Sequence, residues 1–133
     1  MYTFKKEERL CNKKLIEGLF RSGSSFLCYP FRVSWQPAVL PQNVPVQVLF
    51  AVAKKRYKHA VDRNLVKRRI REAYRLHKQE CLYQYLQQQQ KQIILSVGYV
   101  GKEITDYKFM EKKMQKLLQQ LNELVNADVV TTA

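Results

Sequence analysis

The sequence predicts an α+β fold, a single-domain α/β sandwich with the order α-β-β-β-α-β-α and a central sheet of about four strands. Three observations support this fold: two short apolar runs, three longer stretches with apolar residues at three- and four-residue spacing, and breaks containing proline or glycine. A chain of 133 residues, of which 46% are hydrophobic, is long enough to bury one core. We therefore expect one domain over residues 1–133, with flexible ends at 1–8 and 127–133.

The first half of the chain predicts one helix and then strands. Asn12 is placed to cap a helix that runs through Phe20 and ends at 22–24 (Ser-Gly-Ser). Residues 26–35 alternate as a strand, with a bend or break at Pro30. Prolines at 37, 41 and 45 mark a loop, and the apolar run 46–53 predicts a buried strand, central in the sheet.

The second half predicts a long helix, a strand and a final helix. The long helix is expected from about Lys58 to about 77, with a continuation toward 86, and the glutamine run Gln87–Gln90 then forms a helix end or a surface loop. Residues 93–97 predict a second buried strand that ends at Gly98. Thr105 or Asp106 can cap the last helix, whose lysines at 112, 113 and 116 lie outside its apolar stripe.

The segment 54–75 is the most informative part of the chain. It holds ten Lys or Arg residues, opposed only by Asp62 and Glu72. At about 100° of turn per residue, the polar and basic residues 64, 68, 71 and 75 fall on one side of the helix, and Val66, Ile70 and Ala73 fall on the other. Ordinary solvated helices mix charges of both signs, so this one-signed face predicts binding to a polyanion, with nucleic acid favoured over a solvated surface.

The overall charge supports the same class of partner. Lys and Arg outnumber Asp and Glu by 24 to 11, which makes the formal charge +13 and favours an RNA partner over an acidic protein or a membrane surface. Three cysteines without a CxxC spacing argue against a disulfide framework or a structural zinc site. Without a signal-like N-terminus or a long apolar run, we expect a cytoplasmic protein that does not enter the membrane.

Aromatic residues accompany the basic segment, and most of them are expected in the core. Tyr57 and Tyr74 flank the charge cluster and are the better candidates for surface stacking on bases. His59 and His77 fall near the apolar side of the helix and are expected to be structural. No paired carboxylates, glycine-rich phosphate loop or metal-ligand spacing stands in the sequence, which predicts no catalytic site on the protein itself.

A long motif gives this chain a family resemblance. After the buried strand come Lys54-Lys55, Ala60-Val61, Arg63-Asn64, Lys67-Arg68 and residues 71–75 (Arg-Glu-Ala-Tyr-Arg). These residues resemble the signature of the bacterial ribonuclease P protein component. The order of the other elements also fits that family, over residues 9–125.

The resemblance implies a fold, a function and partners. The basic helix of the family makes a left-handed crossover between parallel strands, contrary to the usual rule. The implied function is that of the protein subunit of ribonuclease P, whose partner RNA uses divalent metal (Mg) to hydrolyse precursor tRNA at the 5′ leader, with the protein alone inactive. The implied partners are the catalytic RNA, with one protein per RNA, and precursor tRNA. A non-catalytic ribosomal or RNA-assembly protein is the alternative, and a DNA-binding protein is less favoured because no helix-turn-helix spacing precedes the basic helix.

The resemblance also implies two sets of site residues. The leader cleft would contain Ile16, Phe20 and Phe31. Two departures from the family pattern stand at Leu65, where an arginine is usual, and at Ile16, where an aromatic is common; the RNA contact missing at Leu65 could move to Arg69. The RNA-binding set comprises Lys54, Lys55, Lys58, Arg63, Asn64, Lys67, Arg68, Arg69, Arg71 and Arg75.

Overall fold

The computed structural model describes residues 4–41 and 43–132, with side chains described as far as Asn126. Its centre is a four-stranded sheet in the order β1-β2-β4-β3. β2 is antiparallel to both of its neighbours, β1 and β4, and β3 pairs with β4 in parallel. The predicted α+β class and the four-stranded sheet are therefore confirmed. The strands span Ser24–Cys28 (β1), Phe31–Pro37 (β2), Val46–Val52 (β3) and Ile93–Tyr99 (β4).

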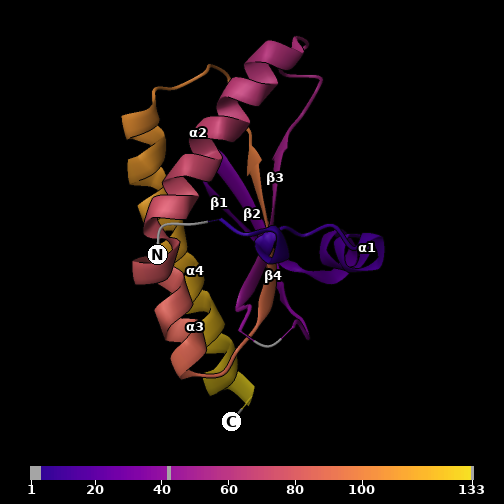
Figure 1. The fold of residues 1–133 in the computed structure, drawn as a ribbon, viewed down its shortest axis with the longest axis vertical. Helices are drawn as coiled ribbons and strands as arrows, with labels where there is room; N and C mark the ends of the chain where they lie inside the picture. The colour runs from indigo at the N-terminus through magenta and orange to yellow at the C-terminus, as the bar shows by residue number, and fades with distance from the viewer. Residues whose placement is uncertain (1–3, 42, 133) are drawn as a thin grey trace.

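Helices cover the two faces of the sheet unequally. α1 packs on one face, and α2, α3 and α4 form a layer on the other (Figure 1). α2 runs into a single turn of π-helix, η2, and then into α3, so the predicted long helix does continue beyond residue 77. The helices span Lys6–Glu8 (η1, a 3-10 turn), Lys13–Ser22 (α1), Ala60–Lys78 (α2), Gln79–Tyr83 (η2), Gln84–Gln88 (α3) and Tyr107–Thr132 (α4).

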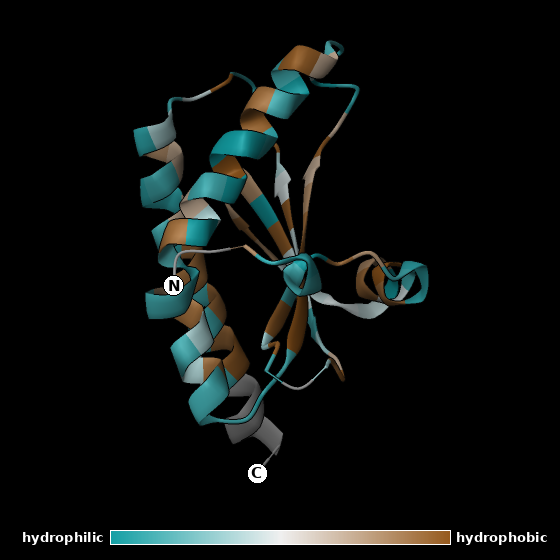
Figure 2. Ribbon diagram, in the orientation of Figure 1, coloured by the Kyte–Doolittle hydropathy of each residue, from teal (hydrophilic) through white to brown (hydrophobic). Residues whose placement is uncertain are grey.

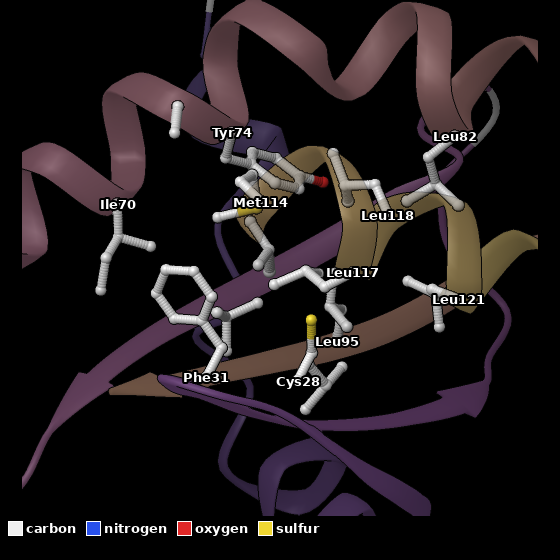
Figure 3. Close-up of a cluster of buried hydrophobic side chains, with 14 of the residues drawn as sticks. Cys28, Phe31, Ile70, Tyr74, Leu82, Leu95, Met114, Leu117, Leu118 and Leu121 are labelled. Carbon is white, nitrogen blue, oxygen red and sulfur yellow. The ribbon is translucent and has the colours of Figure 1, made fainter. Parts of the chain in front are cut away.

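The main core lies between the sheet and the α2–α4 layer. Figure 3 shows Phe31 of β2 beneath Ile70 and Tyr74 of α2 and Met114 of α4, all of which are fully buried. Val66, Ile70 and Ala73, the predicted apolar side of α2, are all fully buried. A smaller cluster on the opposite face places Leu19 of α1 with buried residues of the sheet and of the loop 38–44.

Helix ends follow the predicted capping residues. The Asn12 Oδ1 atom accepts hydrogen bonds from the backbone N–H groups of Lys14 (2.9 Å) and Leu15 (3.2 Å). Asp106 Oδ1 accepts from the N–H of Phe109 at 2.9 Å, so Asp106 rather than Thr105 caps α4. The glutamine run closes α3: Gln90 has a positive φ of 55°, and the N–H of Lys91 donates to the carbonyl of Leu86.

Two strand predictions were wrong. β3 lies at the edge of the sheet rather than in its centre, because β4 separates it from β2. Its continuous apolar run is explained by cover on both faces and by a bridge from Arg9 to Val48 along its outer edge. β4 continues through Gly98 to Tyr99 instead of ending at the glycine, because Gly98 keeps its register with Arg32 of β2 and Ala51 of β3.

The junction between α1 and β1 has no room for a side chain at Gly23. A Cβ atom there would lie 2.4 Å from the carbonyl oxygen of Leu19 and 3.1 Å from that of Trp35. We expect Gly23→Ala to destabilise the protein by about 1–3 kcal/mol, because α1 must shift on the sheet to relieve the contact. Urea unfolding measures this loss. Gly18→Ala is the matched control, because nothing lies within 4 Å of a Cβ at Gly18; an equal loss in both variants would contradict the steric argument.

Three predictions are not decided by this arrangement. The α2 connection joins the parallel strands β3 and β4, but the left hand of that crossover stays a prediction. Flexible ends also stay a prediction, and residues 1–3 and 133 of those ends lie outside the described residues. Within the described part of the chain, no helix is both long and apolar enough to cross a bilayer.

Candidate RNA interface

One side of α2 carries exposed cations while the other side is buried. Val66, Ile70 and Ala73 are fully buried, whereas Arg68 and Arg71 are exposed, as the helical phase predicts. Figure 2 shows the resulting alternation of hydrophilic and hydrophobic residues along the helix. Residues 64, 68, 71 and 75 form the surface that we call the α2 basic face. Residue 75 lies 11 positions after residue 64, which corresponds to about 16 Å of helix.

Arg75 has an acidic partner on its own helix. Its Nε and Nη2 atoms donate to the two carboxylate oxygens of Glu72, at 3.1 and 2.5 Å. This bidentate hydrogen bonding lowers the pKa of Glu72, so the pair stays ionised at neutral pH. The remaining positive charge of the α2 basic face is therefore concentrated on Arg68 and Arg71, for which no hydrogen bond or ion pair with another described side chain is seen.

Two arginines of the predicted RNA-binding set donate to the backbone of the protein. Arg63 Nη1 donates to the carbonyl oxygens of Tyr57 (2.8 Å) and Lys58 (2.9 Å), which holds the loop that enters α2. Arg69 Nη1 donates to the carbonyl of Thr105 at 2.6 Å, which ties α2 to the loop before α4. Each guanidinium has five N–H donors, so these bonds leave others available. Both arginines therefore hold neighbouring loops in place through these hydrogen bonds.

The loop between β3 and α2 adds a second group of cations. We call residues 54–58 the basic loop; Lys54, Lys55, Arg56 and Lys58 are all exposed. Tyr57 anchors the loop, because its buried hydroxyl donates to the carbonyl of Gly101 at 2.7 Å. Burial raises the pKa of Tyr57. Arg56 was not in the predicted set, although its place in the same charged run could have indicated it.

The remaining predicted residues of α2 lie between these groups. Asn64 is exposed near the start of the helix, on the same side as Arg68. Lys67 is half-buried, on the flank between the exposed and buried sides. The basic loop directly precedes α2, so its exposed cations and those of the α2 basic face follow one another along the chain.

The sheet face under α1 is only partly covered. In the rows Leu27–Arg32–Gly98–Ala51 and Ser25–Ser34–Ser96–Leu49, small or polar side chains occupy most of the positions across the four strands. Of the predicted cleft residues, Phe20 is 59% exposed and Ile16 is half-buried against the sheet. We call these two rows the open sheet face. It ends at the C-terminus of β3, where the basic loop begins.

Three aromatic predictions were wrong. Phe31 cannot line this surface, because it is fully buried on the opposite face of the sheet, against Tyr99. Tyr57 and Tyr74 were expected at the surface but are 8% and 0% exposed. Tyr74 instead packs edge-on against Phe50 and shares a 2.9 Å hydrogen bond with the hydroxyl of Tyr83. Tyr74 follows Ile70 by one helical turn and therefore lies on the buried side of α2, and this helical phase outweighs its adjacency to charges in the sequence.

Phe20 and Tyr29 are the most exposed aromatic residues in the described part of the chain. Phe20 on α1 is 59% exposed, and Tyr29, at the turn after β1, is 52% exposed. Tyr29 comes one residue after the end of β1, and by alternation it lies on the same side of the chain as Leu27 of the open sheet face. Its hydroxyl accepts a hydrogen bond from the N–H of Lys102 at 3.4 Å. Sequence analysis singled out Phe20 through the family resemblance, but no periodicity distinguished Tyr29 from a core residue.

The two histidines differ in their surroundings: His77 bonds to side chains of α4, and His59 is exposed. His77 Nε2 lies 2.9 Å from Glu111 Oε2, and its Nδ1 lies 3.2 Å from the side-chain amide of Gln115, which joins α2 to α4. His59 was predicted near the apolar side but is exposed, because it precedes the first turn of α2. Among the described residues, no group of three or more His, Cys, Asp or Glu side chains is placed to hold a metal ion.

Sequence comparison identifies relatives over most of the chain. The family model described as Ribonuclease P matches residues 4–122. A ribonuclease P protein component of Porphyromonas gingivalis (strain ATCC 33277) is 38% identical over 117 residues, which cover 88% of this chain and 85% of the relative. A component of the same name from Chlorobium phaeobacteroides is 43% identical over 81 residues, or 59% of this chain and 56% of the relative.

Solved structures share the fold at lower identity. The RNase P protein of Thermotoga maritima superposes with a TM-score of 0.67 at 23% identity, and covers 85% of this chain and 96% of its own. The RNase P protein of Staphylococcus aureus gives a TM-score of 0.64 at 21% identity, and covers 87% of this chain and 96% of its own. At these identities, the solved structures support the fold itself.

Proposed function

Since the chain belongs to the ribonuclease P protein family, we propose that it binds the catalytic RNA of ribonuclease P and the 5′ leader of precursor tRNA. In this complex the RNA hydrolyses the phosphodiester that joins the leader to the mature tRNA. The observation that carries the proposal is the exposed cations of the basic loop and the α2 basic face, in a chain whose residues 4–122 match the family model.

Catalysis is assigned to the RNA in this proposal. The divalent metal, Mg, would be bound by RNA phosphates, and the cations of the protein would lower the repulsion between two large RNAs. Less Mg would then be needed for cleavage, because cationic side chains replace condensed counterions. One protein per RNA suits a surface of this size, and a cytoplasmic location suits tRNA maturation.

The α2 basic face and the basic loop are proposed to contact phosphates of the catalytic RNA. Arg68 and Arg71 have exposed guanidinium groups that can form paired hydrogen bonds with phosphate oxygens. Lys54, Lys55 and Lys58 would extend these contacts as point charges on the same surface. Leu65 is half-buried and lacks a donor, and Arg69 already donates to Thr105, so neither replaces the missing family arginine fully.

The leader is proposed to lie along the open sheet face. A single strand needs an aromatic surface for its bases and cations for its backbone. Phe20 supplies the exposed ring, and Arg32 and the basic loop supply the charge. Ile16 offers packing area but no ring for stacking, so this chain would hold one base fewer than relatives with an aromatic there.

The test is cleavage of a precursor tRNA with a 5′ leader by the ribonuclease P RNA of the same organism at low Mg. We expect little cleavage by the RNA alone, rescue on addition of the protein, and none by the protein alone. No rescue with the cognate RNA would remove the proposal and favour the alternative of a ribosomal or RNA-assembly protein. Cleavage by the protein alone would overturn the assignment of catalysis to RNA.

A further inference from the structure

α4 carries a second line of cations, on its exposed side. Lys108, Lys112 and Lys116 recur every four residues, and all three are exposed. Four residues of α-helix rise about 6 Å, so these lysines extend over about 12 Å along the helix. We call these three residues the α4 lysine stripe.

In the described part of the chain, no acidic side chain forms an ion pair with these three lysines. The neighbours of Lys112 at four residues in each direction are the other two lysines, and like charges at this spacing destabilise a helix by about 0.2–0.5 kcal/mol per pair. The nearest carboxylates of α4 have other partners: Asp106 caps the helix, and Glu111 pairs with His77 and with the Tyr107 hydroxyl at 3.3 Å. The stripe therefore weakens the free helix, and a bound anion would offset this repulsion.

The position of α4 indicates which anion can reach it. α4 packs beside α2 in the layer on one face of the sheet, whereas α1 lies on the other face (Figure 1). The stripe points away from the buried residues Met110, Met114 and Leu117, so it faces outward from the helical layer. The stripe and the α2 basic face both lie opposite the buried residues of their helices, on the outer side of the layer, so one RNA docked there can contact both. A leader on the open sheet face is separated from the stripe by the sheet.

We propose that the α4 lysine stripe is a second phosphate-binding surface, which engages the backbone of the catalytic RNA next to the contacts made by α2. This inference rests on the proposed function, because it takes the same RNA as its partner. Nucleic-acid duplexes carry one negative charge per about 1.7 Å of axis, so a stripe about 12 Å long faces several phosphates. Lysine suits such contacts because its ammonium group binds phosphate as a point charge, without a required geometry.

Lys113 is a neighbouring cation with a different role. Its Nζ lies 5.6 Å from the centre of the half-exposed Phe109 ring, and its carbonyl lies 3.9 Å from the Cys28 thiol. The ring contact holds the Lys113 side chain along α4, and the carbonyl contact places this part of α4 beside β1. A variant of Lys113 would change packing as well as charge, so it is left intact in the test.

The test compares two triple variants that each lower the formal charge from +13 to +10, because each loses three lysines. One carries Lys108→Gln, Lys112→Gln and Lys116→Gln. The control carries Lys6→Gln, Lys13→Gln and Lys14→Gln, at exposed positions outside the basic loop, the α2 basic face and the α4 lysine stripe. Binding to the cognate ribonuclease P RNA is measured over a series of salt concentrations, together with the thermal midpoint of each free protein.

We expect the stripe variant to bind at least about tenfold more weakly near 0.15 M salt, and the slope of log K against log salt to fall by about 2–3 units. Its thermal midpoint should be unchanged or slightly higher, because like-charge repulsion is removed. The control should keep the wild-type slope to within about one unit. Equal losses in the two variants would overturn the proposal, because net charge alone would then explain them.

The outcome separates this inference from the proposed function. Suppose that the wild-type protein binds the cognate RNA and supports cleavage, and that the stripe variant binds as tightly as wild type. Only the proposal that the α4 lysine stripe binds RNA is then refuted. If the wild-type protein neither binds that RNA nor supports cleavage, the proposed function fails first.

Discussion

Replacing Arg68 and Arg71 with alanine is expected to weaken binding to the cognate ribonuclease P RNA by about 30-fold near 0.15 M salt. Each lost phosphate contact removes about 0.9 from the slope of log K against log salt, so the double variant should lose nearly two units. Both side chains are exposed and neither has a described partner, so the free protein should keep its stability. Binding titrations at four or more salt concentrations measure the slope directly.

The control for this prediction removes the same number of positive charges from a different part of the protein. Lys13→Ala with Lys14→Ala removes two exposed cations from the first turn of α1, on the other side of the sheet. An unchanged slope in the Arg68/Arg71 variant would show that neither guanidinium contacts phosphate. A thermal midpoint lowered by several degrees would instead mean that the loss of binding reflects unfolding, and single variants would then be required.

Replacing Lys78 with methionine is expected to destabilise the protein by about 3–5 kcal/mol, since it leaves a buried carboxylate without its cation. Lys78 Nζ pairs with Glu8 Oε1, and both residues are buried, at 4% and 7% exposure. Tyr83 donates to the same oxygen at 2.6 Å, and the N–H of Lys5 donates to Oε2 at 2.7 Å. This network fastens the N-terminal segment to the junction between α2 and η2.

Urea unfolding measures the loss, with a fall in midpoint on the order of 2 M at a normal m-value. A double variant, Glu8→Leu with Lys78→Met, removes both charges and should recover much of the stability, because no ion is then left buried alone. If the single and double variants lost the same free energy, packing of the Lys78 stem rather than the ion pair would be responsible.

The same pair predicts that the free energy of unfolding decreases in acid. Burial raises the pKa of Glu8, but hydrogen bonds from Lys78, Tyr83 and the Lys5 backbone outweigh it, so the folded pKa lies below the ordinary value of 4.5. The unfolded chain therefore binds this proton at a higher pH. The stabilisation is fully present above about pH 4.5 and is lost as pH falls through the folded pKa. Burial lowers the pKa of Lys78.

Much of the fold followed from local patterns in the sequence. The period of the apolar residues placed α2 and α4, and Asn12 and Asp106 capped the helices as their side chains predict. The break at Pro30 divided β1 from β2. These features depend on residues a few positions apart, which is why one chain was enough to predict them.

Errors arose where distant segments meet. The apolar run of β3 suggested a central strand, but Arg9 and the N-terminal segment cover its edge. Tyr74 stands among charges in the sequence, yet its ring fills space beside Phe50 and Tyr83. Phe31 belongs to the buried side of β2, a choice that depends on which face of the sheet receives α2 and α4.

The sequence by itself determined that one helix is cationic on one side and apolar on the other, and it identified the family through residues 54–75. Only the tertiary structure decided which cations remain available. Arg63 and Arg69 donate to backbone carbonyls, Arg75 pairs with Glu72, and Lys78 is buried with Glu8. A charged side chain has the same sequence signature whether it meets water, RNA or a carboxylate, because its partner is set by the packing of segments far apart in the chain.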